Sequence, residues 1–373
     1  MAAKKTILFV TSSRSDFATI APLLRKLHKD RSVRPLLFVT GDHTQKDTGK
    51  TYKEIQALGF KIDALHTVAG SPAQIAGSVV QAVGRYIDTH EVDYVLLCAD
   101  RKEMLAAGVA ATLARVPIFH IHGGDVSYGM PDDAMRHALS KFASVHFTAS
   151  PLSAKRLKQM GEESWRVHMT GSPDLDGLKA ADAREVLRCF NLSARRYALV
   201  LLNPEIDLGE SGNRALARSI ISALHSYNRP IIVLYPNNDQ GSSAIRKEYA
   251  GLPKKRFSVH RHLPRREYAA LLANAEFLIG NSSSGIIEAA SFKTPVVNVG
   301  KRQNGRERNK NTIDASATSA AIGKSIKKAR GMKPLAHNIY GDGKATQRIC
   351  AILKKVMRRY STQELLYKKF PLL

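Results

Sequence analysis

Short apolar runs alternate with amphipathic segments along the chain, and this alternation constrains the fold more than any other feature. The first half has apolar runs at 6–11, 34–41, 92–99, 116–124, 143–150 and 165–173, with helix-like segments between them. A polar stretch at 174–196 follows, and the pattern then resumes at 197–204, 229–238, 256–262, 276–281 and 294–300. Uniformly apolar strands joined by helices are typical of parallel sheets that are covered on both faces.

The length and the break near 174–196 predict two domains. The 373 residues are long for one core and sufficient for two. We expect a Rossmann-like domain at 1–180, a second at 181–342 with a hinge near 175–195, and a C-terminal helix in 343–373 that packs back on the first domain. The predicted class is α/β, with two Rossmann-like domains facing each other across a cleft in the GT-B arrangement.

Composition excludes several other classes of protein. No apolar run approaches the roughly 18–20 residues that span a bilayer. The apolar run after the N-terminal lysines is too short for a signal peptide and has no cleavage site, so we expect a cytoplasmic protein. The three cysteines, Cys98, Cys189 and Cys350, are far apart and include no C-x-x-C, which argues against a disulfide framework and a zinc site.

The formal net charge of +25 is concentrated late in the chain. Such an excess could indicate nucleic acid, an anionic membrane surface or a polyanionic substrate. Aromatic residues do not alternate with the basic ones, as a base-stacking surface requires. We therefore interpret the charge as a solvated basic face and expect no nucleic-acid partner, with a polyanion-binding protein kept as the alternative from a different class.

A polar cluster follows the apolar run in "EFLIGNSSSGIIEAAS" (276–291). Ser282, Ser283, Ser284 and Gly285 would open the next helix, where free backbone N–H groups favour an anion. Glu288, about one turn later, could accept hydrogen bonds from ribose hydroxyls. A serine N-cap followed by an ordinary helical Glu explains the same residues. Nearby groups that could contact a diphosphate are Asn238 in "YPNNDQGSS" and Arg302, with Arg306 and Arg308.

In the first domain, polar groups again follow the predicted strands. The candidates are Arg14, Asp100, Asp125, Asp132, Asp133, Arg136 and His137. Each acid alone fits a helix N-cap. Several carboxylates at one sheet edge raise at least one pKa toward the working range, which favours acid–base chemistry. His120 and His122 would share a face of a strand, but the chain lacks a convincing third and fourth metal ligand, so we expect no metal.

Taken in order, these blocks resemble the hydrolysing UDP-N-acetylglucosamine 2-epimerases, especially the branch that feeds sialic-acid-type nonulosonate and surface-polysaccharide synthesis. The resemblance rests on "VTSSRSDF", "VTGDH", "ADRKEMLA", "HIHGGDVS…DDAMRHALSK", "GSPDLD", "YPNNDQG" and "IGNSSSGIIEA…RQNGR". It covers most of the chain. It implies a homodimer that needs no metal or redox cofactor and takes a UDP-sugar as substrate.

The resemblance also implies a reaction. UDP leaves C1 as the C2 proton is removed, which gives a 2-acetamidoglucal, and water then adds with inversion at C2 to release N-acetylmannosamine. By motif position Asp100 would be the acid/base, with Asp125 and Asp132 or Asp133 as its partners. The implied substrate-binding residues are Arg14, His43, Arg136, His137, Asn203, Asn238, Ser282, Ser283, Ser284, Gly285, Glu288 and Arg302.

Two positions depart from the family pattern. The family usually has Glu at Asp125, and the shorter side chain places its carboxylate about 1.5 Å further back, a shift to which catalysis is sensitive. The family's second domain usually has His-Pro where this chain reads "LLNPE", with Asn203. Asparagine cannot exchange a proton near pH 7. Either Asn203 only positions substrate, or a different sugar is used, or Glu205 or His43 takes over.

The sequence leaves the substrate open. The alternative to UDP-N-acetylglucosamine within the same reaction is a UDP-2,4-diacetamido-2,4,6-trideoxy hexose of the legionaminic-acid type. A glycosyltransferase on the same scaffold would also need UDP-binding groups. It would not explain the carboxylates in "ADRKE" and "GGDVS…DD".

Overall fold

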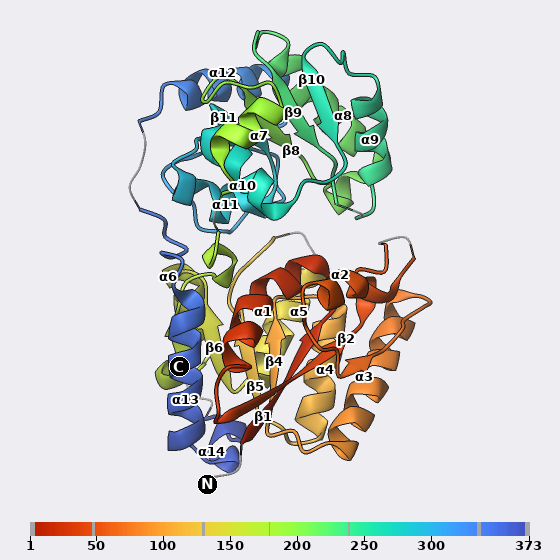
Figure 1. Cartoon of the computed structure of the whole chain (residues 1–373), viewed down its shortest axis with the longest axis vertical. Coiled ribbons are helices and arrows are strands. Elements are labelled where there is room, and N and C mark those ends of the chain that lie inside the picture. Colours follow the sequence, from red (N-terminus) through yellow and green to blue (C-terminus); the bar gives the residue numbers. More distant parts are fainter. Residues whose placement is uncertain are drawn as a thin grey trace. The chain divides into compact units, whose positions relative to one another are not determined.

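The computed structural model describes residues 4–46, 49–128, 131–178, 180–237, 239–333 and 337–369 (Figure 1). The chain divides into two compact units. The first unit comprises Met1–Val126, Pro131–Asp176 and Tyr340–Leu373, and the second comprises Ser127–Met130 and Gly177–Ile339. Each unit contains a parallel sheet with helices, so the predicted α/β class is confirmed.

The sheet of the first unit has the order β3-β2-β1-β4-β5-β6-β7 within the described residues, and all its pairs are parallel. The order reverses between β1 and β4, and ligands bind at such a reversal in open α/β sheets. The strands are β1 (Lys5–Thr11), β2 (Val33–Val39), β3 (Ala64–Leu65), β4 (Tyr94–Cys98), β5 (Ile118–Ile121), β6 (Val145–Thr148) and β7 (Val167–Met169).

Helices cover both faces of this sheet, which explains why its strands are apolar throughout. Along β1, Ile7 and Phe9 belong to the core on one face, and Leu8 and Val10 belong to the core on the other. Side chains of α1 and α13 contribute to the first core, and those of α3, α4 and α5 to the second. The helices are α1 (Arg14–Leu27), α2 (Tyr52–Ala57), α3 (Pro72–Thr89), α4 (Lys102–Leu113), α5 (Pro131–Phe142), α6 (Pro151–Gln159), α13 (Ala345–Arg359) and α14 (Thr362–Leu366), with 3₁₀ turns η1 (Gly41–Thr44), η2 (Ser164–Arg166) and η3 (Pro173–Leu175).

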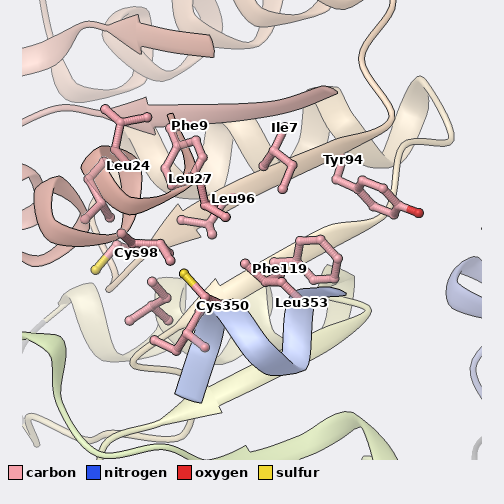
Figure 2. Close-up of a cluster of buried hydrophobic side chains, with 14 of the residues drawn as sticks. Ile7, Phe9, Leu24, Leu27, Tyr94, Leu96, Cys98, Phe119, Cys350 and Leu353 are labelled. Atoms are coloured by element: carbon pink, nitrogen blue, oxygen red, sulfur yellow. The ribbon is translucent and has the colours of Figure 1, made fainter. Parts of the chain in front are cut away.

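The C-terminal helix α13 packs on the first unit, as the sequence predicts. Its apolar face contributes Ile349, Cys350, Leu353 and Val356 to the core that also contains Phe9 (Figure 2). The segment after it is held by a fully buried guanidinium. Arg166 donates hydrogen bonds to the carbonyl oxygens of Leu365 (2.9 Å) and Tyr367 (2.7 Å).

The second unit has a parallel sheet of order β10-β9-β8-β11-β12-β13 within the described residues, which reverses between β8 and β11. The sequence predicts neither β13 nor the two-residue β3, because β13 is a half-exposed edge strand without an apolar run. Its elements are α7 (Ala183–Cys189), β8 (Ala198–Leu201), η4 (Ile206–Leu208), α8 (Gly209–Leu224), β9 (Ile231–Leu234), α9 (Ser242–Ala250), β10 (Phe257–His260), α10 (Arg265–Asn274), β11 (Phe277–Gly280), α11 (Ser283–Ile287), η5 (Ala289–Phe292), β12 (Val296–Val299), β13 (Thr312–Ala315) and α12 (Ser319–Arg330).

The packing of α13 yields a stability prediction. Leu353→Ala removes a fully buried side chain from the core of the first unit and should lower the free energy of unfolding by about 2–5 kcal/mol. Lys355→Ala, two residues later on the exposed side of the helix, should change it by less than about 0.5 kcal/mol. Urea denaturation followed by circular dichroism measures both. Equal losses in the two variants would contradict the packing described here.

Candidate active site

A buried guanidinium on α5 joins two of the predicted carboxylates. Arg136 is 1% exposed and forms an ion pair with Asp100, which follows β4. Its other terminal nitrogen, Nη1, lies 3.9 Å from Oδ2 of Asp125, which follows β5. A buried charge requires opposite charges close by, because burial removes its water shell. The three residues come from different elements of the first unit and form one cluster.

The cluster continues through a histidine to a third carboxylate. Nδ1 of His122 lies 3.1 Å from Oδ2 of Asp125, and its Nε2 lies 3.5 Å from Oδ2 of Asp174. Asp100, Arg136, Asp125, His122 and Asp174 therefore alternate in charge, and we call these five residues the charge network. Burial by itself lowers the pKa of His122, but hydrogen bonds to Asp125 and Asp174 raise that pKa to about 10.

Two hydroxyl groups hold the carboxylates of the charge network in place. Ser153 at the start of α6 donates a hydrogen bond to Oδ1 of Asp125 at 2.6 Å. Ser172 donates to Oδ2 of Asp174 at 3.1 Å, and its Oγ lies 3.3 Å from Nε2 of His122. Neither Ser153 nor Asp174 is among the candidates predicted from the sequence. The "GSPD" block after β7 could have signalled Asp174, since this segment also ends a predicted strand.

Asp100 does not act as the N-cap that its sequence position suggests. The N-cap of α4 is Arg101, and its side chain makes no capping hydrogen bond. The carboxylate of Asp100 instead pairs with Arg136, and its side chain is 18% exposed. Asp100 also follows β4, one of the two strands that flank the reversal of strand order, where ligands bind in such sheets.

The other predicted residues of α5 lie close to Arg136 along the helix. Asp132 lies one turn before Arg136 and therefore on the same face. Asp133 lies one turn before His137, and its Oδ1 is 3.9 Å from Nε2 of that histidine. Burial lowers the pKa of His137. Asp133 also lies three residues before Arg136, so both acids are on the face of Arg136, and Asp133 is the one whose carboxylate lies near His137.

Arg14 and His43 lie near the end of β1 in different surroundings. Arg14 is exposed, and its Nε donates to Oε2 of Glu54 at 3.0 Å. His43 is buried, with Nε2 3.0 Å from Oγ1 of Thr11 and Nδ1 2.6 Å from Oγ1 of Thr51. Burial lowers the pKa of His43. His43 therefore organises the strand end, whereas Arg14 is in an exposed ion pair, which is weak.

In the second unit, the serine cluster caps α11. Oγ of Ser282 accepts from the backbone N–H of Ser284 at 3.3 Å, and Oγ of Ser284 donates to Oε2 of Glu288 at 2.9 Å. Ser283 is the first residue of α11. Gly285 faces the sheet, where a Cβ atom would lie 3.0 Å from Cγ1 of Val296. Packing against β12 therefore explains the glycine without a ligand.

Asn203 bridges the ends of three strands in the second unit. Its N–H donates to Oδ1 of Asn281 at 2.7 Å, and Asn281 Nδ2 donates to its carbonyl oxygen at 2.9 Å. Its own side-chain oxygen accepts from the N–H of Asn237 at 2.9 Å. Asn203 thus joins the reversal between β8 and β11 to the segment after β9. The neighbouring Asn238 lies outside the described residues.

Glu205 and Arg302 meet in the loop after β12. Oε1 of Glu205 accepts from the N–H groups of Lys301 (2.8 Å) and Arg302 (3.2 Å). The guanidinium of Arg302 lies 3.4 Å from the carbonyl oxygen of Asn281, just before the serine cluster. The carboxylate of Glu205 is therefore engaged in holding this loop, and Arg302 is brought next to Ser282.

Neither a metal centre nor a membrane span emerges from the part of the chain that the structure describes. No group of three or more His, Cys, Asp or Glu side chains there could hold a metal ion. His120, considered above as a metal ligand, lies 2.9 Å from the carbonyl oxygen of Ala99 through its Nε2. None of the described helices is both long and apolar enough to cross a membrane.

The raised pKa of His122 predicts a pH dependence. An unfolded histidine titrates near pH 6.5, so the stabilisation from His122 is complete below about pH 6.5 and is lost as the pH rises through about 10. Ring-nitrogen NMR should find this imidazole doubly protonated at about pH 8. Asp174→Asn removes one of its partners and should lower the pKa. A neutral imidazole at pH 8 in the wild-type protein would contradict the charge network.

The family model and the curated relatives that match this chain all point to the same protein family. A family model described as UDP-N-acetylglucosamine 2-epimerase matches residues 25–354. The UDP-N,N'-diacetylbacillosamine 2-epimerase (hydrolyzing) of Legionella pneumophila is 36% identical over 370 residues, which cover 94% of this chain and 96% of that protein. The UDP-N-acetylglucosamine 2-epimerase of Neisseria meningitidis serogroup B is 32% identical over 331 residues, 87% of each chain.

A solved structure supports the same fold. The crystal structure of UDP-GlcNAc 2-epimerase from Neisseria meningitidis bound to UDP-GlcNAc matches with a TM-score of 0.82 at 18% identity, covering 94% of this chain and 100% of that one. The resemblance seen in the sequence is thereby confirmed, and the protein is an enzyme. The chain belongs to the UDP-N-acetylglucosamine 2-epimerase family.

Proposed function

We propose that the protein is a hydrolysing UDP-sugar 2-epimerase that acts on a UDP-2,4-diacetamido-2,4,6-trideoxy hexose for nonulosonate synthesis. The charge network carries the proposal, because it gathers Asp100 and Asp125 around a buried cation at the strand ends of a family member. The Legionella relative, named for a diacetamido sugar, supports this substrate. The Neisseria relative makes UDP-N-acetylglucosamine the second candidate. Family membership favours both over a glycosyltransferase or a polyanion-binding protein.

The reaction has two steps that balance without a redox cofactor. In the first, a base removes the C2 proton, the C1–O bond breaks, and the C–H electron pair becomes the C1=C2 bond while UDP leaves. In the second, water adds its hydroxyl to C1, and C2 receives a proton on the opposite face. The products are UDP and the free sugar with inverted C2.

Carboxylates of the first unit would perform the proton transfers. We assign the acid/base role to Asp100, which is partly exposed and stands at the reversal of strand order. Asp125 and Asp132 are its proposed partners. The contact of Asp133 with His137 makes it the weaker candidate of the two acids on α5. Arg136 balances the negative charges that the two steps require at this site.

The second unit would hold UDP. We assign the diphosphate to the hydroxyls of Ser282, Ser283 and Ser284 with Arg302, and a ribose hydroxyl to Glu288. Because α11 has only five residues, its dipole contributes little, and side-chain donors carry this assignment. Arg14 is available as a phosphate ligand, since its exposed ion pair with Glu54 is easily exchanged.

Asn203 takes a positioning role in this proposal. Its side-chain oxygen already holds the N–H of Asn237, and its backbone is paired with Asn281. Glu205 is engaged with the loop at Lys301, and His43 with two threonines. None of the three is therefore needed for proton transfer. The carboxylates around Arg136 account for it.

Asp100→Asn tests the assigned chemistry. It should lower kcat by about 10²–10⁴-fold, because the amide cannot take the C2 proton, while UDP still binds. The measurement is UDP release from both UDP-sugars, with UDP affinity by calorimetry. Asp88→Asn, the same change at an exposed position of α3, should be active. Turnover by Asp100→Asn at the wild-type rate would refute the role, and no UDP release from either sugar by the wild type would reject the function.

A homodimer through α4 is the assembly that we propose. The helix α4 is apolar on all sides, and such helices are normally buried. Yet Leu113 is 75% exposed, and Leu105 and Val109, at i−8 and i−4 on the same stripe, are half-buried. The chain has a net charge of +25, so two copies repel each other over most charged surfaces. Because this face carries no charge, two copies can associate there without such repulsion.

Leu113→Glu tests this interface. A carboxylate in the proposed contact should convert dimers to monomers in sedimentation velocity, because its burial without a partner is costly. Leu58→Glu, at another exposed leucine of the first unit, serves as the control and should remain dimeric. A monomeric wild-type protein, or an unchanged dimer in Leu113→Glu, would contradict the assignment.

A further inference from the structure

The residue that precedes Asp100 adopts an unusual backbone conformation. Ala99 has φ +65°, in the left-handed region that residues with a Cβ atom avoid. Its carbonyl oxygen lies 2.9 Å from Nε2 of His120, which is fully buried on β5. That oxygen belongs to the peptide group that joins Ala99 to Asp100. Because a peptide group is planar, a bond to its oxygen also sets the direction in which Asp100 begins.

The protonation of His120 follows from its partners. A carbonyl oxygen can only accept, so the proton is on Nε2, and Nδ1 is left as an acceptor. Burial, together with the neighbouring His146, lowers the pKa of His120 to about 3, so the imidazole is neutral in the range where enzymes are assayed. The hydrogen bond to Ala99 is therefore a fixed contact that does not titrate in an assay.

The opposite edge of the same ring contacts the helix of the charge network. Oγ of Ser140 on α5 lies 3.4 Å from Nδ1 of His120 and 3.0 Å from the carbonyl oxygen of Arg136. Both atoms are acceptors, so the single hydroxyl proton of Ser140 is directed to one or the other, and it bonds the ring when it points to Nδ1. One imidazole therefore touches both segments that bring Asp100 and Arg136 together. Any buried histidine needs hydrogen-bonding partners. His120 differs because its two partners lie in the segments that carry Asp100 and Arg136, the two members of one ion pair.

A glycine next to the ring makes room for it. A Cβ atom at Gly123 would lie 2.9 Å from Nδ1 of His120 and 3.2 Å from Nδ1 of His146. No side chain fits there unless the imidazoles move. The first glycine of the "HGGD" block is thus explained by the placement of His120, independently of the contact with Ala99.

We propose that His120 is a positioning residue for Asp100: it holds the Ala99–Asp100 peptide in its left-handed turn and ties that turn to the helix that carries Arg136. This rests on the acid/base role proposed for Asp100. His120 touches neither substrate nor the reacting atoms. Its removal should let Asp100 relax away from Arg136 and so slow the chemical step, while UDP binding by the second unit is unaffected.

Kinetics of matched variants test the proposal. His120→Leu removes both hydrogen-bonding nitrogens and should lower kcat by about 10–100-fold, with KM within about twofold, since a displacement of about 1 Å has effects of this size. His120→Gln places an amide nitrogen the same number of bonds from Cα as Nε2 and should recover most of the loss. Ile118→Ala, which truncates a buried side chain on the same strand, should keep kcat near the wild-type value.

Gly123→Ala serves as a second variant, because it displaces the ring without removing it and should show the same fall in kcat. The inference is overturned if His120→Leu is as active as Ile118→Ala, or if Gln rescues no better than Leu. A crystal structure of His120→Leu tests the positioning role of His120 without relying on enzyme activity. We expect Ala99 to leave the left-handed region and the Asp100–Arg136 pair to open, and an unchanged turn and pair would overturn the inference even if the proposed function failed.

Discussion

The guanidinium of Arg136 is the constraint on which the site depends. A buried, permanently charged group is strongly destabilising unless carboxylates surround it, and here those carboxylates come from the loops after β4 and β5. The fold of the first unit must therefore bring the ends of two strands to one face of α5. Asp100 and Asp125 share Arg136 as a counterion, and Asp125 is also held by Ser153 and His122.

The network also ties the site to the C-terminal helix of the same unit. Asp174 lies in η3, two residues before Asp176, whose carboxylate accepts hydrogen bonds from the N–H groups of Ala345 (2.9 Å) and Thr346 at the start of α13. Asp174 therefore contacts His122, and Asp176 in the same segment caps the N-terminus of α13. The three residues from Asp174 to Asp176 thus connect the charge network to the helix α13, which packs in the core.

Periodicity predicted the α/β class, most strands and the return of α13, because buried parallel strands and amphipathic helices leave strong patterns. It could not predict β13, whose edge position requires no apolar run. Among the candidate site residues, Asp100, Asp125 and Arg136 could be named because each follows a strand or belongs to a distinctive block. Asp174 follows a predicted strand in the "GSPD" block, but its contact with His122 appears only in the folded unit. The left-handed turn at Ala99 held by His120 leaves no pattern in the sequence, since it depends on strands brought together by the fold.

The most direct measurement of the central claim is NMR analysis of the sugar released in D₂O. Proton transfer by the carboxylates around Arg136 predicts UDP together with a free 2-acetamido sugar that carries deuterium at C2 in the inverted configuration. Protium at C2 would show that the C2 proton does not exchange with solvent, and retained configuration would show that C2 is reprotonated on its original face. Either result would contradict the account.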